Sequence, residues 1–195
     1  MLPPLYIVRH GRTDWNAEQR LQGQADTDIN EVGRAQADRN GDRLARLVDD
    51  PQAFTYIASP LRRTCETMQR IRSRMGLPPE GYATDPRLKE VHFGDWQGFT
   101  YVELEAREPG CTDARTKAKW HFLPPGDNAE NYEILTERVA SWFKDVQRPT
   151  ICVTHGGVIR AIFHLIGKMP VDEAAEAHIP QDRILRVADG HLEWL

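Results

Sequence analysis

The chain has 195 residues, of which 40% are hydrophobic, enough for one globular domain with a single core. Its net charge is -4 and its charged residues are interspersed, which excludes the one-sided basic excess of a nucleic-acid-binding surface. No linker or repeat divides the sequence, so we expect residues 1–195 to form a single domain.

Cysteine usage and hydropathy indicate a cytoplasmic protein. Cys65, Cys111 and Cys152 are odd in number and far apart, which argues against a disulfide framework or a zinc knuckle. The N-terminal residues lack the basic segment and apolar core of a signal peptide. The most apolar stretch, 158–166, contains Arg160 and His164 and is too short to cross a bilayer, so no membrane association is expected.

The first half of the chain alternates predicted strands and helices. Residues 5–8 are a continuous apolar run, typical of a strand that is buried on both faces. A helix is predicted over 31–48, and a second strand over 54–58. Ser59 is predicted to cap the next helix, with Pro60 at its first helical position and Gly76 at its end. The expected apolar side of the first helix is Val32, Ala35, Leu44, Leu47 and Val48.

The pattern weakens between 81 and 125, where prolines and glycines separate four short candidate elements. A helix is predicted over 128–146, because apolar residues recur there at helical spacing. A third buried strand is predicted over 150–154, followed by a helix over 156–166. Two last strands, 183–187 and 191–195, are joined by an Asp-Gly turn.

Apolar strands that alternate with amphipathic helices predict an α/β fold, a three-layer α/β/α sandwich around a mostly parallel sheet. Ligands of such sheets bind beyond the carboxyl ends of the strands. The predicted strands end at Arg9-His10, just before Arg62-Arg63, and at His155. Two histidines and two or three arginines should therefore converge at one end of the sheet.

This set of side chains suits phosphoryl transfer. A neutral imidazole is a nucleophile that forms covalent intermediates, and neighbouring guanidinium groups disfavour its protonated form. The same guanidinium groups bind phosphoryl oxygens and stabilise the charge of the transition state. Gly156-Gly157 opens a helix, whose N-terminus also favours anions. No two histidines have the helical i, i+4 spacing with a nearby carboxylate, so no catalytic metal is expected.

Four motifs in order resemble the histidine phosphatase superfamily, in its phosphoglycerate-mutase-like branch. They cover most of the chain and are RHGRTDWN from Arg9 with LQG from Leu21, SPLRR from Ser59, LKE from Leu88 with FGDW from Phe93, and VTHGG from Val153. The resemblance implies that His10 is phosphorylated during turnover and that Glu90 is the general acid and then the base. It implies that Arg9, Arg63 and His155 hold the phosphoryl group. Further phosphate or substrate contacts are implied for Asn16, Gln22, Gly23 and Gly156.

The resemblance favours a phosphatase over a mutase. The segments FGDWQG and LQGQAD are similar to those of phosphatase-like members, and the chain is shorter than the glycolytic mutases. The expected activity is hydrolysis of a small phosphorylated metabolite without a metal or other cofactor. The alternatives are a cofactor-dependent phosphoglycerate mutase and, because all five implied catalytic residues are present, less readily a degenerate binding protein. The expected assembly is a monomer or a homodimer.

Three features depart from the family pattern or bear on the substrate. Gln97 stands where phosphatase-like members usually carry glutamate, and segment 125–131 is longer and differently composed than usual. Residues 99–125 are expected to form a cap over the site. Its cations either meet a second anionic group of the substrate or form a solvated surface, and they are Arg107, Arg115, Lys117, Lys119 and His121. Trp96, Trp120 and Phe122 are expected to pack in the interior.

Overall fold

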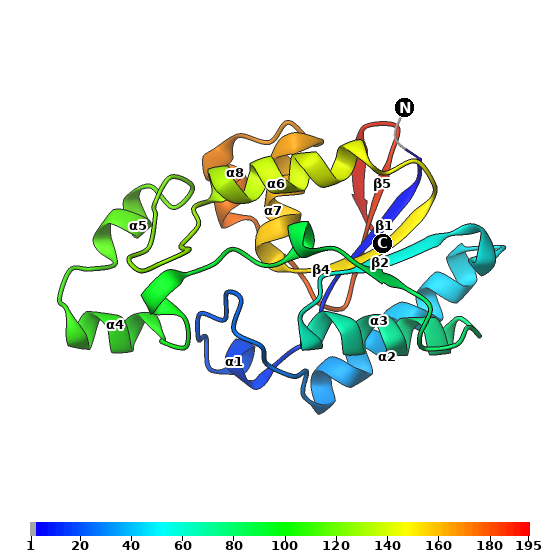
Figure 1. The fold of residues 1–195 in the computed structure, drawn as a ribbon, viewed down its shortest axis with the longest axis horizontal. Coiled ribbons are helices and arrows are strands. Elements are labelled where there is room, and N and C mark those ends of the chain that lie inside the picture. Colours follow the sequence, from blue (N-terminus) through cyan, green and yellow to red (C-terminus); the bar gives the residue numbers. More distant parts are fainter. Residues whose placement is uncertain (1–2) are drawn as a thin grey trace.

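The structure, a computed structural model, describes residues 3–195. Its centre is a sheet in the order β3-β2-β4-β1-β5-β6 (Figure 1). The strands are β1 Leu5–Arg9, β2 Thr55–Ala58, β3 Ala83–Thr84, β4 Thr150–Thr154, β5 Ile184–Ala188 and β6 His191–Trp194. The first four pair in parallel, whereas β5 and β6 pair antiparallel. The predicted fold is confirmed.

Helices cover both faces of this sheet (Figure 1). Helices α2 and α3 lie on one face, and α6, α7 and α8 on the other. Along β1, Ile7 belongs to the core beneath α6 and α7, while Val8 belongs to the core beneath α2 and α3. This alternation explains the continuous apolar run, because both faces of the strand are buried. The longer helices are α2 Glu31–Leu47, α3 Arg62–Arg74, α6 Tyr132–Lys144 and α7 Gly156–Leu165.

Helix α2 ends one residue before the predicted end, and its predicted apolar side is only partly correct. Leu44 and Val48 are buried as predicted. Val32 and Leu47 are 49% and 40% exposed, and Ala35 is also exposed. The buried side instead contains Gly41, where an added Cβ would lie 2.7 Å from Cβ of Arg74 on α3. The glycine that weakens the helix in the sequence thus permits close packing of α2 on α3.

Two predicted helix starts were wrong. Helix α3 begins at Arg62, two residues after Pro60, and its N-cap is Leu61 without a side-chain cap. Helix α6 begins at Tyr132 rather than at residue 128. The side chain of Asn131 accepts a hydrogen bond from the backbone amide of Ile134 and so caps the helix at that point. Two short helices escaped prediction, α1 Asp14–Ala17 and α8 Val171–Glu176.

Segment 81–125 contributes the edge strand β3 to the sheet and otherwise contains short helical elements. These are the 3₁₀ turns Pro86–Leu88 and Gly94–Trp96 and the helices α4 Tyr101–Arg107 and α5 Asp113–Lys117. In Figure 1, α4 and α5 stand to one side of the sandwich. Trp96 stacks on Phe122 and Trp120 on Tyr132, which confirms their expected packing role. Within residues 3–195, no helix has the length and apolar character needed to cross a membrane.

Candidate active site

The carboxyl ends of β1 and β4 bring two histidines together. His10 directly follows β1, and its amide donates to the carbonyl of Thr154 at the end of β4. His155 follows β4 and is the N-cap residue of α7. The ring centroids of His10 and His155 are 5.2 Å apart, and both side chains are buried. The convergence predicted from the strand ends is therefore present.

The hydrogen bonds of His10 select one ring nitrogen as a nucleophile. Its Nδ1 lies 2.8 Å from the carbonyl oxygen of Gly11, which accepts only, so Nδ1 carries the proton of the neutral ring. The lone pair is then on Nε2. Burial and the charges of Arg63 and Arg9 hold the pKa of His10 well below its usual value. The ring is therefore neutral at physiological pH.

The hydrogen bonds of His155 leave one of its ring nitrogens without a partner. Its Nε2 lies 2.7 Å from the hydroxyl of Ser59, and its buried Nδ1 has no partner among residues 3–195. If Ser59 donates to Nε2, Nδ1 carries a proton that only a ligand can accept. Burial and the positive charge of Arg63 lower the pKa of His155 well below its usual value. Ser59, predicted to cap a helix, instead orients this histidine.

Main-chain carbonyls fix the two arginines. The Nη atoms of Arg63 donate to the carbonyls of Ala25 and Gly23, each at 2.7 Å, and Nη1 of Arg9 donates to Ile179 at 2.7 Å. The Nε atoms of both arginines are buried and unpartnered within the described chain. Burial lowers the pKa of each arginine to about 10, opposed by the negative charge of Glu90. Both remain cations at neutral pH.

Glu90 reaches the same site through the start of α7. Its two carboxylate oxygens accept hydrogen bonds from the backbone nitrogen of Gly157, at 3.0 and 3.1 Å. Oε1 also accepts a hydrogen bond from the backbone nitrogen of Val91, at 2.9 Å. A Cβ at position 157 would lie 2.2 Å from Oε1 of Glu90, so only glycine leaves room for the carboxylate.

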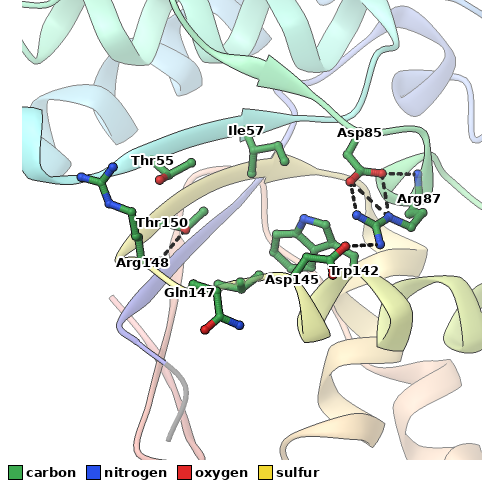
Figure 2. A pocket seen from close by; sticks show the side chains of 10 residues that line it. Thr55, Ile57, Asp85, Arg87, Trp142, Asp145, Gln147, Arg148 and Thr150 are labelled. Atoms are coloured by element: carbon green, nitrogen blue, oxygen red, sulfur yellow. Dashed lines mark hydrogen bonds and ion pairs between the residues drawn. The ribbon is translucent and has the colours of Figure 1, made fainter.

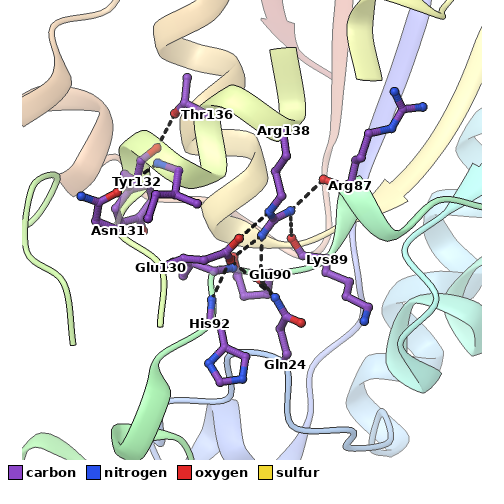
Figure 3. Close-up of polar contacts among 12 residues, drawn as sticks. Gln24, Arg87, Lys89, Glu90, His92, Glu130, Asn131, Tyr132, Thr136 and Arg138 are labelled. Carbon is purple, nitrogen blue, oxygen red and sulfur yellow. Dashed lines mark hydrogen bonds and ion pairs between the residues drawn. The ribbon is translucent and has the colours of Figure 1, made fainter. Parts of the chain in front are cut away.

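An ion pair that sequence reasoning missed holds the main chain around Glu90 (Figure 3). Arg138 on α6 donates to the carbonyls of Arg87, Lys89 and Glu90 at 2.6 to 3.0 Å. It also binds both carboxylate oxygens of Glu130 at 2.8 Å. Glu130 belongs to the unusual segment 125–131 and accepts the amide of His92 at 3.0 Å. One signal was available: Glu130 lies two residues before α6, and Arg138 lies on the second turn of that helix.

The remaining predicted contacts line the same region. The side-chain oxygen of Asn16 accepts hydrogen bonds from the backbone amide of Thr13 and from Nε2 of Gln181. The side-chain nitrogen of Asn16, Nδ2, is thereby left for a ligand. Gln181 also donates to the carbonyl of His10 at 2.9 Å. It follows α8 and had no distinguishing pattern in the sequence.

Two further predictions concern the loop after α1. The side chain of Gln22 is fixed by the hydroxyl of Thr27, and the carbonyl of Gly23 binds Arg63. Gln97 accepts the amide of Gln24 at 2.6 Å, so its oxygen supports this loop. Arg62, next to Arg63, is exposed and pairs with Asp28, outside the histidine site.

The arrangement suits a tetrahedral anion. Three unpartnered buried nitrogens, Nε of Arg9, Nε of Arg63 and Nδ1 of His155, belong to side chains around His10. A buried donor without a partner is costly, and an oxyanion would satisfy all three. Gly156, at the start of α7, places no side chain between Arg9 and Arg160. An anion bound between these two arginines could therefore also contact the backbone amides at the N-terminus of α7.

A separate cavity of about 220 Å³ lies along β2 and β4 (Figure 2). It includes the first residue of each strand, Thr55 and Thr150, whereas the histidines follow the last residues. Trp142 lines it, and Arg87 pairs with Asp145 at 2.7 Å beside it. It contains neither histidine of the site.

Comparison with known proteins places the chain in a family. The model of the histidine phosphatase superfamily, branch 1, matches residues 5–192. Glucosyl-3-phosphoglycerate phosphatase of Mycolicibacterium vanbaalenii is 36% identical over 179 residues, covering 86% of this chain and 76% of the relative. Metal-independent phosphoserine phosphatase of Arabidopsis thaliana is 34% identical over 164 residues, covering 82% and 66%.

A solved structure agrees with these matches. The native structure of mycobacterial glucosyl-3-phosphoglycerate phosphatase has a TM-score of 0.74 and 30% identity, covering 95% of this chain and 90% of that chain. The resemblance that the four motifs predicted is confirmed. The chain belongs to the histidine phosphatase superfamily, branch 1.

Proposed function

We propose that this chain is a metal-independent phosphomonoesterase that hydrolyses a small phosphorylated metabolite through a phosphohistidine on His10. The observation that carries the proposal is the set of three buried, unpartnered nitrogens on Arg9, Arg63 and His155 around a neutral imidazole. The relatives named as phosphatases support the same reaction class.

In the first step, Nε2 of His10 attacks phosphorus and the bond between phosphorus and the leaving oxygen breaks. Arg9, Arg63 and the Nδ1 proton of His155 hold the phosphoryl oxygens and stabilise their charge. Glu90 gives its proton to the leaving oxygen, so the product leaves as a neutral alcohol.

In the second step, Glu90, now a carboxylate, takes a proton from water as the water oxygen attacks phosphorus. The bond between Nε2 of His10 and phosphorus breaks, and inorganic phosphate and a neutral imidazole are produced. The side-chain nitrogen of Asn16 supplies a further donor to the phosphoryl group. Gln22, Gly23 and Gly156 line the pocket, and residues 99–125 act as its cap.

All the proposed catalytic side chains come from one chain, so a monomer or a homodimer is sufficient for activity. The three cysteines are free thiols, which supports a location in the reducing cytoplasm. A mutase would use the same first step and then transfer the phosphoryl group to a second substrate hydroxyl. Retention of His10, Glu90 and both arginines in one site argues against a degenerate binding protein.

Phosphate release from a panel of phosphorylated metabolites, measured in the presence of a chelator, tests this function. We expect turnover that survives chelation, is little changed by magnesium, and is abolished in His10→Ala. A second variant, Arg63→Ala, is compared with Arg62→Ala as its matched control. The two arginines are adjacent, but only Arg63 lies in the site. Loss of turnover on chelation, with recovery on adding a divalent ion, would contradict the proposal. Transfer to an added hydroxyl compound in preference to water would favour the mutase.

A further inference from the structure

The loop after α1 contacts both halves of the proposed site. The carbonyls of Gly23 and Ala25 each accept a hydrogen bond from Arg63 at 2.7 Å. Between these two residues, the side chain of Gln24 points towards Glu90 (Figure 3). Its Nε2 donates to the carbonyl oxygen of Glu90 at 3.1 Å. Three consecutive residues thus connect the arginine that binds the phosphoryl group with the proposed proton donor.

The main chain of Gln24 is fixed by a separate contact. Its amide donates to Oε1 of Gln97 at 2.6 Å. The preceding residue, Gly23, has a φ of +52°, and a Cβ at that position would collide with the same oxygen of Gln97. Only glycine permits this backbone conformation so close to Gln97. The side chain of Gln24 is therefore presented to Glu90 from a backbone that is held in place.

The hydrogen bond from Gln24 is the one direct link between this loop and Glu90. Within the part of the chain that the structure describes, no other residue of 21–25 donates to Glu90 or accepts from it. The second donor to the carbonyl of Glu90 is Arg138 of α6, at 3.0 Å. Arg138 therefore ties Glu90 to the helical layer, whereas Gln24 ties it to the loop that holds Arg63.

The proposed reaction depends on the relative placement of these two groups. Arg63 holds oxygens of the phosphoryl group, and Glu90 must reach the leaving oxygen that is bonded to the same phosphorus. A misplacement of about 1 Å between such groups can lower the rate by about 10²-fold. The arginine is held by main-chain carbonyls and not by the side chain of Gln24. Loss of that side chain should therefore impair protonation of the leaving group more than binding of the anion.

We propose that Gln24 is a positioning residue, which sets the place of Glu90 relative to Arg63. The inference deepens the proposed phosphatase function and rests on it. The position requires a hydrogen-bond donor, because Nε2 faces the carbonyl of Glu90 and lies 3.5 Å from a carboxylate oxygen of Glu130. A carboxylate at position 24 would instead place an acceptor against two acceptors.

The test uses the full chain and compares kcat/KM for glycerol phosphate and for p-nitrophenyl phosphate, whose leaving group barely needs a proton. Gln24→Met keeps the length of the side chain but removes the donor. It should lower kcat/KM by about 10-fold for glycerol phosphate and by less than about 3-fold for the aryl ester. The inhibition constant of inorganic phosphate should stay within about 2-fold of the wild-type value, because the phosphoryl ligands are unchanged.

Three further variants serve as rescue, opposite and control. Gln24→Lys restores a donor and should recover most of the loss on glycerol phosphate. Gln24→Glu removes the donor and adds a repelling acceptor, so it should lose at least as much as Gln24→Met. Gln52→Met is the matched control, since Gln52 is exposed in the 3₁₀ turn Pro51–Ala53, and it should change kcat/KM for neither ester.

A double variant separates a positioning role from a merely structural one. If Gln24 acts through Glu90, Gln24→Met should lower kcat/KM by less than about 2-fold in a Glu90→Gln background. An unchanged Gln24→Met enzyme, equal losses on the two esters, the full loss in the Glu90→Gln background, or a Gln24→Lys variant no better than Gln24→Met would each overturn the proposal. Hydrolysis of p-nitrophenyl phosphate by the wild type keeps the two proposals apart, because its absence would defeat the phosphatase itself.

Discussion

Gly157→Ala should weaken catalysis by displacing Glu90. The added Cβ would lie 2.2 Å from Oε1 of Glu90, so the carboxylate must move by about 1 Å to reach a normal contact. That movement also breaks the hydrogen bonds from the amide of residue 157. A misplacement of about 1 Å can cost a factor of about 10² in rate. Alanine is better than glycine in a helix by up to about 1 kcal/mol, which offsets crowding against Leu135.

The assay compares kcat/KM for glycerol phosphate and for p-nitrophenyl phosphate. We expect a loss of about 10²-fold for glycerol phosphate and a smaller loss for the aryl ester, whose leaving group barely needs a proton. Gly156→Ala is the matched control, because the three atoms nearest to its Cβ would belong to Arg160 and Arg9, at ordinary distances of 3.4 Å or more, and not to Glu90. Any loss there should be equal for the two esters. Equal losses in Gly157→Ala, with an unchanged thermal midpoint, would refute Glu90 as the proton donor.

Three further substitutions or conditions test neighbouring parts of the site. Glu90→Gln should slow esters with poor leaving groups by about 10²- to 10⁴-fold, measured as kcat/KM, and equal loss on aryl esters would place the acid elsewhere. Arg138→Met leaves Glu130 unpaired and should lower the free energy of unfolding by about 3 kcal/mol in urea titrations; a change below about 1 kcal/mol would contradict this. Because the pKa values of His10 and His155 are lowered in the folded state, only the unfolded chain gains protons just below pH 6.5. Unfolding free energy should therefore fall there with decreasing pH, by up to about 1.4 kcal/mol per pH unit for each histidine, and less steeply in His10→Asn. A flat profile would contradict buried neutral rings.

Much of the fold was predictable because its strands are short, apolar and separated by helices. The strands before His10 and His155 are buried on both faces, and parallel strands place their carboxyl ends together. The errors arose where tertiary contacts outweigh local signals. Ser59 has the residue type of a helix cap, yet its hydroxyl lies beside His155, a contact between residues 96 positions apart. The buried side of α2 includes Gly41, which no hydrophobic pattern would select.

The parts of the site that were missed act through the main chain. Arg138 donates to three carbonyls around Glu90, and Gln181 donates to the carbonyl of His10. A sequence pattern reveals side chains of a reactive type at strand ends, but every residue offers a carbonyl. Which carbonyls lack a partner depends on the tertiary fold, so residues that satisfy them carry no local signal.

The central claim is that His10 carries the phosphoryl group during turnover. The most direct measurement is rapid acid-free quenching of Glu90→Gln with a phosphorus-labelled ester, followed by mass spectrometry of the labelled peptide. Slow hydrolysis of the intermediate in this variant should let it accumulate, and the label should be found on the imidazole of His10. Label on another residue, or continued ester hydrolysis by His10→Ala at the wild-type rate, would contradict the mechanism.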